Sequence, residues 1–263
     1  MLGKAERAKT LEKLAVSMVS GVELPERTLY FMTPTPLLQR RAKSMLSKEP
    51  DTIQWIDRFE RDDVFWDVGA NVGVFSFYAA CRRQVRVLAF EPSADNYMVL
   101  CNNVEMNRLQ GCVTPYCVAL AGRTELGVLN SPSREMGGSL HQFGAEGEIS
   151  RYSNGANSTC AQGMIGFTVD DFIQQFGPPF PTRLKLDVDG LEWPILHGAK
   201  QTLRDPRLQS IMVELPISDG TERDRAIAWL SDVGFELVSC GSIQESGGES
   251  AANHFFERRK AGS

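Results

Sequence analysis

Short apolar runs and longer stretches with helical spacing alternate along most of the chain, from residue 64 to residue 258. The runs have the length of strands, whereas the stretches between them repeat their apolar residues every three or four positions, as one face of a helix does. The runs predict strands at residues 64–68, 85–90, 113–120, 184–188, 210–215, 235–240 and 254–258. The stretches predict helices at residues 72–81, 94–107, 168–176, 191–203 and 223–233.

This alternation is typical of an α/β fold in which helices cover both faces of a mostly parallel sheet. No helix is predicted between the last two strands, so we expect the final strand to run antiparallel to its neighbours. The pattern therefore predicts a Rossmann-like fold with seven strands. A further short strand is expected over residues 124–129.

Two regions depart from the alternation. In residues 1–61, positions 11, 14, 15 and 18 share one helical face, prolines at 34 and 36 break the pattern, and a second helix is expected at 51–59. We predict a short N-terminal helical extension that packs on a main domain of residues 62–263. Residues 131–166 are rich in Gly and Ser and have little periodicity, which indicates a mobile loop over the substrate, or else an insertion without function.

The composition is that of a globular protein and limits the partners to expect. Of the 263 residues, 42% are hydrophobic and 23% charged, and the formal net charge is −5. Lys and Arg form no basic stripe, so we expect no nucleic-acid partner. No run approaches the ~18 apolar residues of a membrane span, and the charged N-terminus does not resemble a signal peptide. Six cysteines without a CxxC pair favour a reducing compartment, so we expect a cytoplasmic protein with no membrane partner.

The strongest chemical signal is DVGANVG at residues 67–73, between the first predicted strand and the first predicted helix. Glycine at this turn lets backbone approach a ligand closely, and Gly73 lets the helix pack tightly on the strand. Glu91 ends the second predicted strand, where a carboxylate can accept hydrogen bonds from both ribose hydroxyls of an adenosyl group. Because the spacing is not GxGxxG, it favours a nucleotide-type site other than that of a dinucleotide.

A second cluster of acids follows the fourth and fifth predicted strands. Asp187 and Asp189 come directly after one strand, and Glu214 ends the next, so we expect the three carboxylates to converge near the reacting atoms. One of them can act as a general base, or two or three can hold Mg²⁺. The alternative is a structural role, in which Glu192 caps the start of the following helix electrostatically and Asp189 shapes the turn. We expect the metal-free case, with Mg²⁺ as the alternative.

Six segments of the chain share one resemblance. They are DVGANVGVFSFYAA, VRVLAFEPSADNYMVLCNNVEMN, VALAGRTEL, TVDDFI, LKLDVDGLEWPILHGAKQTL and the terminal NHFFER. Together, from about residue 64 to 215, they resemble the FkbM-type methyltransferases. The resemblance implies a class I methyltransferase fold, S-adenosylmethionine as methyl donor, and O-methylation of a hydroxyl on a sugar or small-molecule metabolite.

The resemblance also implies roles by position. The donor-binding loop would consist of Asp67, Gly69, Ala70, Asn71 and Gly73, with Asp67 facing the methionine ammonium directly or through water. Glu91 would hold the ribose, and Pro92 and Ser93 would shape the adenosine pocket. The asparagines at 103 and 107 match the family, either as ligand contacts or as helix-end caps. Asp189 departs from the family, which usually has glutamate there.

Two other functions are compatible with the residues alone. A nicotinamide-dependent oxidoreductase would use the same fold, although the chain has no GxGxxG and no evident hydride-handling site. A non-catalytic adenosyl-binding module would need no acid cluster. Among the histidines, we would test His141 alone as a base, and a solvent-exposed residue is the simpler explanation for it.

Overall fold

The structure is a computed structural model, and it describes residues 18–144, 160–217, 220–246 and 249–259. Its main sheet follows the order β5 (Val113–Tyr116), β4 (Arg86–Phe90), β3 (Val64–Val68), β10 (Arg183–Leu186), β11 (Ser210–Pro216), β14 (Glu249–Arg258) and β12 (Phe235–Cys240). The first five are parallel to one another, and β14 is antiparallel to both of its neighbours. The short strand β13 (Gln244–Ser246) pairs with β14. The predicted sheet is therefore confirmed, including its antiparallel final strand.

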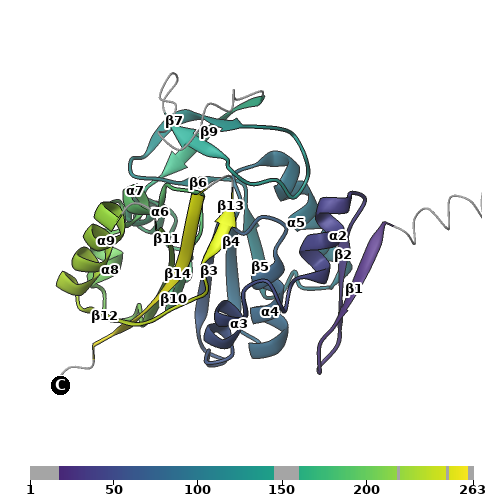
Figure 1. The fold of residues 1–263 in the computed structure, drawn as a ribbon, viewed down its shortest axis with the longest axis horizontal. Coiled ribbons are helices and arrows are strands. Elements are labelled where there is room, and N and C mark those ends of the chain that lie inside the picture. The colour runs from purple at the N-terminus through teal and green to yellow at the C-terminus, as the bar shows by residue number, and fades with distance from the viewer. Residues whose placement is uncertain (1–17, 145–159, 218–219, 247–248, 260–263) are drawn as a thin grey trace, which may run out of the picture.

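Helices cover both faces of this sheet (Figure 1). One face packs against α3 (Pro50–Ile56), α4 (Val74–Arg83) and α5 (Ala94–Met106), and the other against α6 (Val169–Phe176), α7 (Glu192–His197), α8 (Lys200–Arg204) and α9 (Gly220–Asp232). Successive residues of a strand point to opposite faces, so Phe65 enters the first core and Trp66 the second. Because both faces are buried, the strands read as continuous apolar runs. The helix predicted over 191–203 is divided into α7 and α8.

The N-terminal segment differs from the helical extension that we predicted. Residues 19–32 form an antiparallel hairpin of β1 (Val19–Glu23) and β2 (Thr28–Met32), followed by α2 (Pro36–Lys43) and then α3. The sequence TLYFM alternates, with Leu29 and Phe31 buried, which is the period of a strand. The helix expected near residues 11–18 lies almost wholly outside the described residues.

Asparagines of α5 attach the hairpin to the main domain. Asn103 accepts a hydrogen bond from the Met32 backbone N (2.7 Å), and Asn107 accepts one from the Tyr30 N (2.8 Å) while donating to the Tyr30 carbonyl (2.6 Å). These amides pair with the edge of β2 as a neighbouring strand would. Neither asparagine lines the cavity described below, so the ligand role for this pair is not supported.

A smaller sheet of four strands lies above the main sheet in Figure 1, where β7 and β9 are labelled. Its order is β6 (Ala119–Leu120), β9 (Cys160–Phe167), β7 (Glu125–Ser131) and β8 (Gln142–Gly144). Two predictions are corrected here. The strand expected over 113–120 is divided between the two sheets, and the expected loop over 131–166 has strands at both ends, while residues 145–159 lie outside the described residues. Glycines at 127, 163 and 166 interrupt the alternation of apolar residues by which a strand is predicted. Two of them, Gly127 and Gly166, leave space for the ring of Phe143.

Candidate active site

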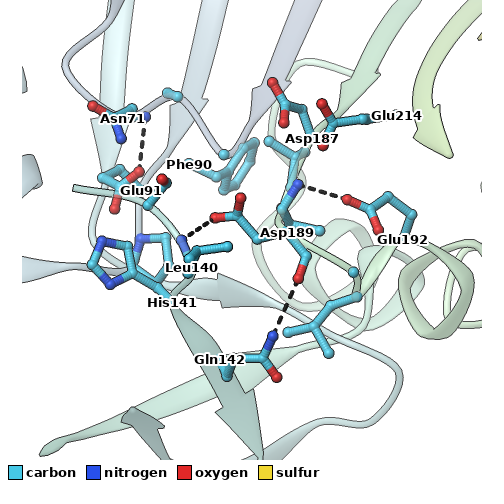
Figure 2. A pocket seen from close by; sticks show the side chains of 18 of the residues that line it. Asn71, Phe90, Glu91, Leu140, His141, Gln142, Asp187, Asp189, Glu192 and Glu214 are labelled. Atoms are coloured by element: carbon cyan, nitrogen blue, oxygen red, sulfur yellow. Dashed lines mark hydrogen bonds between the residues drawn. The ribbon is translucent and has the colours of Figure 1, made fainter. Parts of the chain in front are cut away.

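A cavity of about 540 Å³ opens where parallel strands β4, β3, β10 and β11 end. Open α/β sheets bind their ligands at this edge. Residues 69–71 and Glu91 line what we call the loop end, and Asp187 and Glu214 line what we call the acid end (Figure 2). The two ends face one space because β3 and β10, which separate β4 from β11, are adjacent strands. Helix α2 and the smaller sheet contribute the remaining walls through residues such as Arg41, Leu129 and Gln142.

The turn after β3 is shaped by a close backbone approach. Gly69 has φ +82°, and a Cβ added to it would lie 1.8 Å from the carbonyl oxygen of Asp187. The amides of Gly69 and Ala70 both donate to the Phe90 carbonyl at 3.0 Å. We expected the glycine to make space for a ligand, but the structure uses that space to bring β10 against the loop. Gly69, Ala70 and Asn71 line the cavity as predicted.

Glu91 is buried at the loop end and is held by backbone amides. Its Oε2 accepts from the Asn71 N (2.8 Å) and its Oε1 from the Ser93 N (2.9 Å), and the first of these bonds is drawn in Figure 2. Burial raises the pKa of Glu91 to about 7, although the hydrogen bonds from Ser93 and Asn71 oppose the shift. Glu91 and Pro92 line the cavity, so both predicted residues face the space where a ligand would lie.

Three predicted residues lie behind the cavity wall instead. A Cβ at Gly73 would lie 2.4 Å from the Phe77 ring of α4 and 2.6 Å from Leu100 of α5, so the close packing at this glycine is with two helices and not with the strand that we predicted. Ser93 contributes only its backbone amide, to Glu91. Asp67 accepts a hydrogen bond from the Ser76 hydroxyl at 2.6 Å and lies 3.5 Å from the Lys185 ammonium. The direct contact expected between Asp67 and a ligand ammonium is therefore not supported, because its carboxylate is turned inward to a buried lysine.

Lys185 connects the two carboxylates of the central strands. Its side chain is 1% exposed, and its Nζ donates to Asp187 Oδ2 at 2.8 Å. Burial alone would lower the pKa of Lys185, but the charges of Asp187 and Asp67 outweigh it and raise this pKa, so the lysine stays charged. Burial alone would likewise raise the pKa of Asp187, and Lys185 outweighs it and lowers that pKa. The pair thus keeps Asp187 ionised.

The pKa of Glu214, on the neighbouring strand β11, is shifted in the opposite direction to that of Asp187. Leu186 and Val213 are the last paired residues of β10 and β11, so Asp187 and Glu214 follow them side by side. The charge of Asp187, then burial, raises the pKa of Glu214 to about 10. Figure 2 shows the two carboxyl groups near one another at the acid end. One carboxyl is therefore ionised and its neighbour protonated at neutral pH, the separation that acid–base sites use.

Asp189 does not join this pair. Its φ of +57° ends the extended backbone on which we expected Asp187 and Asp189 to point the same way. Its carboxylate turns to the smaller sheet and accepts from the Leu140 N at 2.6 Å, while its carbonyl accepts from the Gln142 side chain at 3.2 Å. Burial, then the charge of Asp187, raises the pKa of Asp189 to about 6. Asp187, Asp189 and Glu214 thus line one cavity, but the Asp189 carboxylate is bonded to the Leu140 amide and does not point the same way as Asp187. Among the described residues, no three Asp, Glu, His or Cys side chains form a metal-binding group.

Glu192 holds the turn after β10. It is 2% exposed, and its Oε1 accepts from the Val188 N at 2.8 Å. Burial raises the pKa of Glu192 to about 8. It stands in the first turn of α7, as expected for a cap, although its hydrogen bond holds the preceding loop.

The segment before β8 is anchored at several points. The Gly138 carbonyl accepts from the side-chain amides of Asn71 (2.7 Å) and Asn96 (3.1 Å), and Asp189 holds Leu140 as above. His141 is bonded to Ser131 Oγ (2.7 Å) and lies 3.3 Å from the Asn96 amide, and burial lowers its pKa. This part of the predicted loop is therefore attached to the main domain, and His141 is not the exposed residue that we expected.

Two of the lining residues that the sequence prediction missed are cations, Lys185 and Arg41. Lys185 carried a signal, because LKLDV places a lysine between apolar neighbours of a central strand, and a lysine there must find partners. Arg41 carried none, since nothing near residues 36–43 shows that α2 reaches the cavity.

The comparisons with known proteins agree with this geometry. The family model described as "Methyltransferase FkbM domain" matches residues 67–237. The chain belongs to the FkbM methyltransferase family. It therefore contains a methyltransferase domain of this family with a class I fold, and the oxidoreductase alternative receives no support. No helix of the described residues is long and apolar enough to cross a membrane.

Two relatives of this FkbM methyltransferase bear on its architecture. The hexuronic acid methyltransferase AglP of Haloferax volcanii is 27% identical over 171 residues, which cover 65% of this chain and 63% of AglP. The chain thus matches less than two thirds of that relative's length. A methyltransferase FkbM from Methylobacillus flagellatus KT has a solved structure that aligns over 94% of this chain and 58% of its own, with a TM-score of 0.50 and 13% identity. That likeness concerns the fold alone.

Proposed function

We propose that this FkbM methyltransferase transfers a methyl group from S-adenosylmethionine to a hydroxyl of a sugar or another small metabolite. The observation that carries the proposal is the single cavity that joins the loop end to the acid end. The loop end has the features of a nucleoside site, and the acid end has an ionised carboxylate beside a protonated one. A non-catalytic binding module would have no need of the second feature.

The loop end fits the adenosyl part of the donor. A carboxylate has about four acceptor positions. The backbone amides of Asn71 and Ser93 and, at 3.4 Å, the side-chain amide of Asn96 occupy three of those of Glu91. The remaining capacity suits the ribose. Val118, Leu120 and Leu129 supply an apolar wall of the same cavity, which suits the flat face of an adenine. When bound, S-adenosylmethionine supplies an electrophilic methyl group on a sulfonium.

The acid end fits removal of a proton from the acceptor. Lys185 keeps Asp187 ionised, so Asp187 can accept the hydroxyl proton as the new carbon–oxygen bond forms. Glu214 is protonated at neutral pH and can donate a hydrogen bond to Asp187 or to the acceptor oxygen. Positioning of the hydroxyl behind the methyl group supplies much of the rate in such a transfer. We propose Asp187 as the base and Glu214 as its neutral partner.

We favour this metal-free arrangement over one with Mg²⁺. The Lys185 ammonium already occupies Asp187 Oδ2, and it would compete with a cation for that carboxylate. Asp189, which we expected as a third ligand, is bonded to the Leu140 amide instead. Full activity in the presence of a chelator is the expected result, and activity that chelation abolishes and Mg²⁺ restores would contradict the metal-free proposal.

The acceptor class is supported by the relative's name. AglP is a hexuronic acid methyltransferase, so hexuronic acids and the matching neutral sugars are the first acceptors to test. Nucleic acids are less favoured because the chain carries a net charge of −5. We therefore propose a small-molecule acceptor.

The direct test is calorimetric titration with S-adenosylhomocysteine and with NAD, followed by an assay with methyl-labelled donor on an acceptor panel. We expect S-adenosylhomocysteine to bind, NAD not to bind, and label to appear on a hydroxyl oxygen of a sugar or small metabolite. Binding of NAD alone, or of neither ligand, would contradict the proposed donor. Label on a nitrogen or carbon would contradict O-methylation.

A further inference from the structure

Three cations line the described part of the cavity, and they differ in how they are paired. Lys185 is bonded to Asp187 at 2.8 Å, and Lys48 to Glu49 at 3.2 Å. Arg41 has no carboxylate within 4.0 Å among the described residues. It belongs to α2, which lies outside the residues that the family model matches.

The Arg41 side chain is held in place by the segment before β8. Its Nε donates to the Gly137 carbonyl at 2.5 Å. Gly137 has φ +82°, and a Cβ there would lie 2.8 Å from Leu38 Cδ2 and 3.4 Å from Arg41 Cδ, so α2 packs directly on this residue. The Gly137 amide in turn donates to Asn96 Oδ1 at 2.7 Å. The guanidinium is thus pre-positioned by a chain of contacts that reaches α5.

Most of the guanidinium's hydrogen-bonding capacity is unused. Arg has five N–H donors in a rigid fork, and within the described ranges only the Nε–H of Arg41 has an acceptor. Burial lowers the pKa of Arg41, and the charges of Asp187, Asp189 and Glu91 partly restore it without touching it. A partly buried cation with a free fork at a cavity wall is suited to an anion that arrives with a ligand.

The surrounding charges restrict which anion fits. Glu91, Asp187 and Asp189 act on Arg41 through space, so an incoming group meets several carboxylates as well as the guanidinium. A dianionic phosphate would be repelled more strongly than a carboxylate with a single charge. A planar carboxylate also matches the two terminal nitrogens of the fork in a bidentate arrangement.

We propose that Arg41 binds a carboxylate group inside the cavity through its two terminal nitrogens. This inference rests on the proposed function, which brings two such groups to the cavity. One is the carboxylate of the methionine part of the donor, and the other is the carboxylate of a hexuronic acid acceptor. The chemistry of recognition is the same for both, and the experiment separates them.

The test uses Arg41→Gln, with Arg40→Gln as the matched control. Arg40 lies on the same helix, is exposed and does not line the cavity, so its variant removes the same charge from α2 without touching the site. One arm measures calorimetric affinity for S-adenosylhomocysteine and for S-adenosyl-3-thiopropylamine, which lacks the carboxylate and keeps the amine. The second arm measures affinity for glucuronate and for glucose in the presence of saturating S-adenosylhomocysteine.

If Arg41 binds the donor, Arg41→Gln weakens S-adenosylhomocysteine at least about tenfold and leaves the decarboxylated analogue unchanged. If it binds the acceptor, the variant weakens glucuronate by a similar factor and leaves both adenosyl ligands unchanged. Arg40→Gln changes neither arm. The inference would be overturned if Arg41→Gln bound S-adenosylhomocysteine as tightly as the wild type and glucuronate also failed to distinguish the two proteins, either by binding both equally or by binding neither. If Arg41→Gln does not fold, Arg41→Lys replaces it, since Lys keeps the charge, loses the fork and should show the same selectivity with a smaller loss.

The outcome for Arg41 is separable from that of the proposed function. Wild-type protein that fails to bind S-adenosylhomocysteine would refute the donor, whatever the variant does. If the wild type and Arg41→Gln bind S-adenosylhomocysteine equally tightly, and also do not differ in their affinity for glucuronate, only the role of Arg41 is refuted.

Discussion

At the loop end of the cavity, Glu91 is held by the backbone amides of Asn71 and Ser93. At the acid end, Lys185 is bonded to Asp187, and the charge of Asp187 keeps Glu214 protonated. Backbone amides are present whatever side chains surround them, so the loop end depends on the shape of a turn. The acid end depends on three ionisable groups that fix one another's protonation. Substitutions at the loop end should therefore act through geometry, and those at the acid end through charge.

The largest effect should come from the acid end. Asp187→Asn keeps the shape of the side chain and removes its ability to take a proton. We expect methyl transfer to fall about 10²–10⁴-fold, the usual contribution of a general base. The affinity for S-adenosylhomocysteine should stay within about threefold, because Glu91 and the loop are untouched. Turnover at the wild-type rate by a folded Asp187→Asn protein would remove the distinction between the two ends.

The next effect concerns the shape of the loop end. Gly69→Ala would place a Cβ 1.8 Å from the Asp187 carbonyl oxygen at a φ of +82°. We expect a loss of about 2–4 kcal/mol in the free energy of unfolding, from backbone strain and overpacking together. Gly163→Ala is the control, because a Cβ there meets nothing within 4 Å. Chemical denaturation measures both, and equal stability of the two variants would show that the close approach is not required.

A smaller loss is expected for Glu91→Ala. Hydrogen bonds that involve a charged group are worth about 1.5–3 kcal/mol, so the affinity for S-adenosylhomocysteine should weaken by that amount. Glu105→Ala changes an exposed glutamate of α5 that does not line the cavity, and it should bind like the wild type. Calorimetry on folded Glu91→Ala with an unchanged dissociation constant would refute the ribose assignment.

The smallest effect is a pH dependence next to the acid end. The pKa of Glu192 is raised to about 8 from 4.5, so folding favours its protonated form. Its contribution to stability is fully present below about pH 4.5 and is lost as the pH rises through about 8. Glu192→Gln stays neutral, so at pH 8 it should exceed the wild type by on the order of 1 kcal/mol, an advantage that disappears near pH 4.

Denaturation curves at both pH values measure this difference. Glu236→Gln, at an exposed position of β12, is the control and should show no such advantage. A Glu192→Gln protein that is less stable than the wild type at pH 8 would contradict the burial account.

The two ends also differed in how far the sequence could predict them. The loop end lies within a strand, a turn and the next strand, so the order of residues alone placed Gly69, Asn71 and Glu91. Asp187 and Glu214 were placed by the expected strand order, which the structure confirms. The direction of the Asp189 side chain was not predicted, because its left-handed φ ends the extended backbone that the strand pattern indicated.

Residues that depend on distant contacts were the hardest to find. Arg41 reaches the cavity because Gly137, far along the chain, accepts from it. The smaller sheet joins residues 119–120 to residues 166–167 across a long separation, and no local pattern specifies that pairing. The hairpin at residues 19–32 was different, since its alternation was present in TLYFM and our prediction assigned that region to helix and loop.

The most direct test of one cavity with two ends is a crystal structure of the protein with S-adenosylhomocysteine. We expect the ribose hydroxyls on Glu91, the adenine against Val118 and Leu120, and the sulfur turned toward Asp187 and Glu214. A ligand bound outside this cavity, or bound inside it with the adenine at the acid end, would contradict the account.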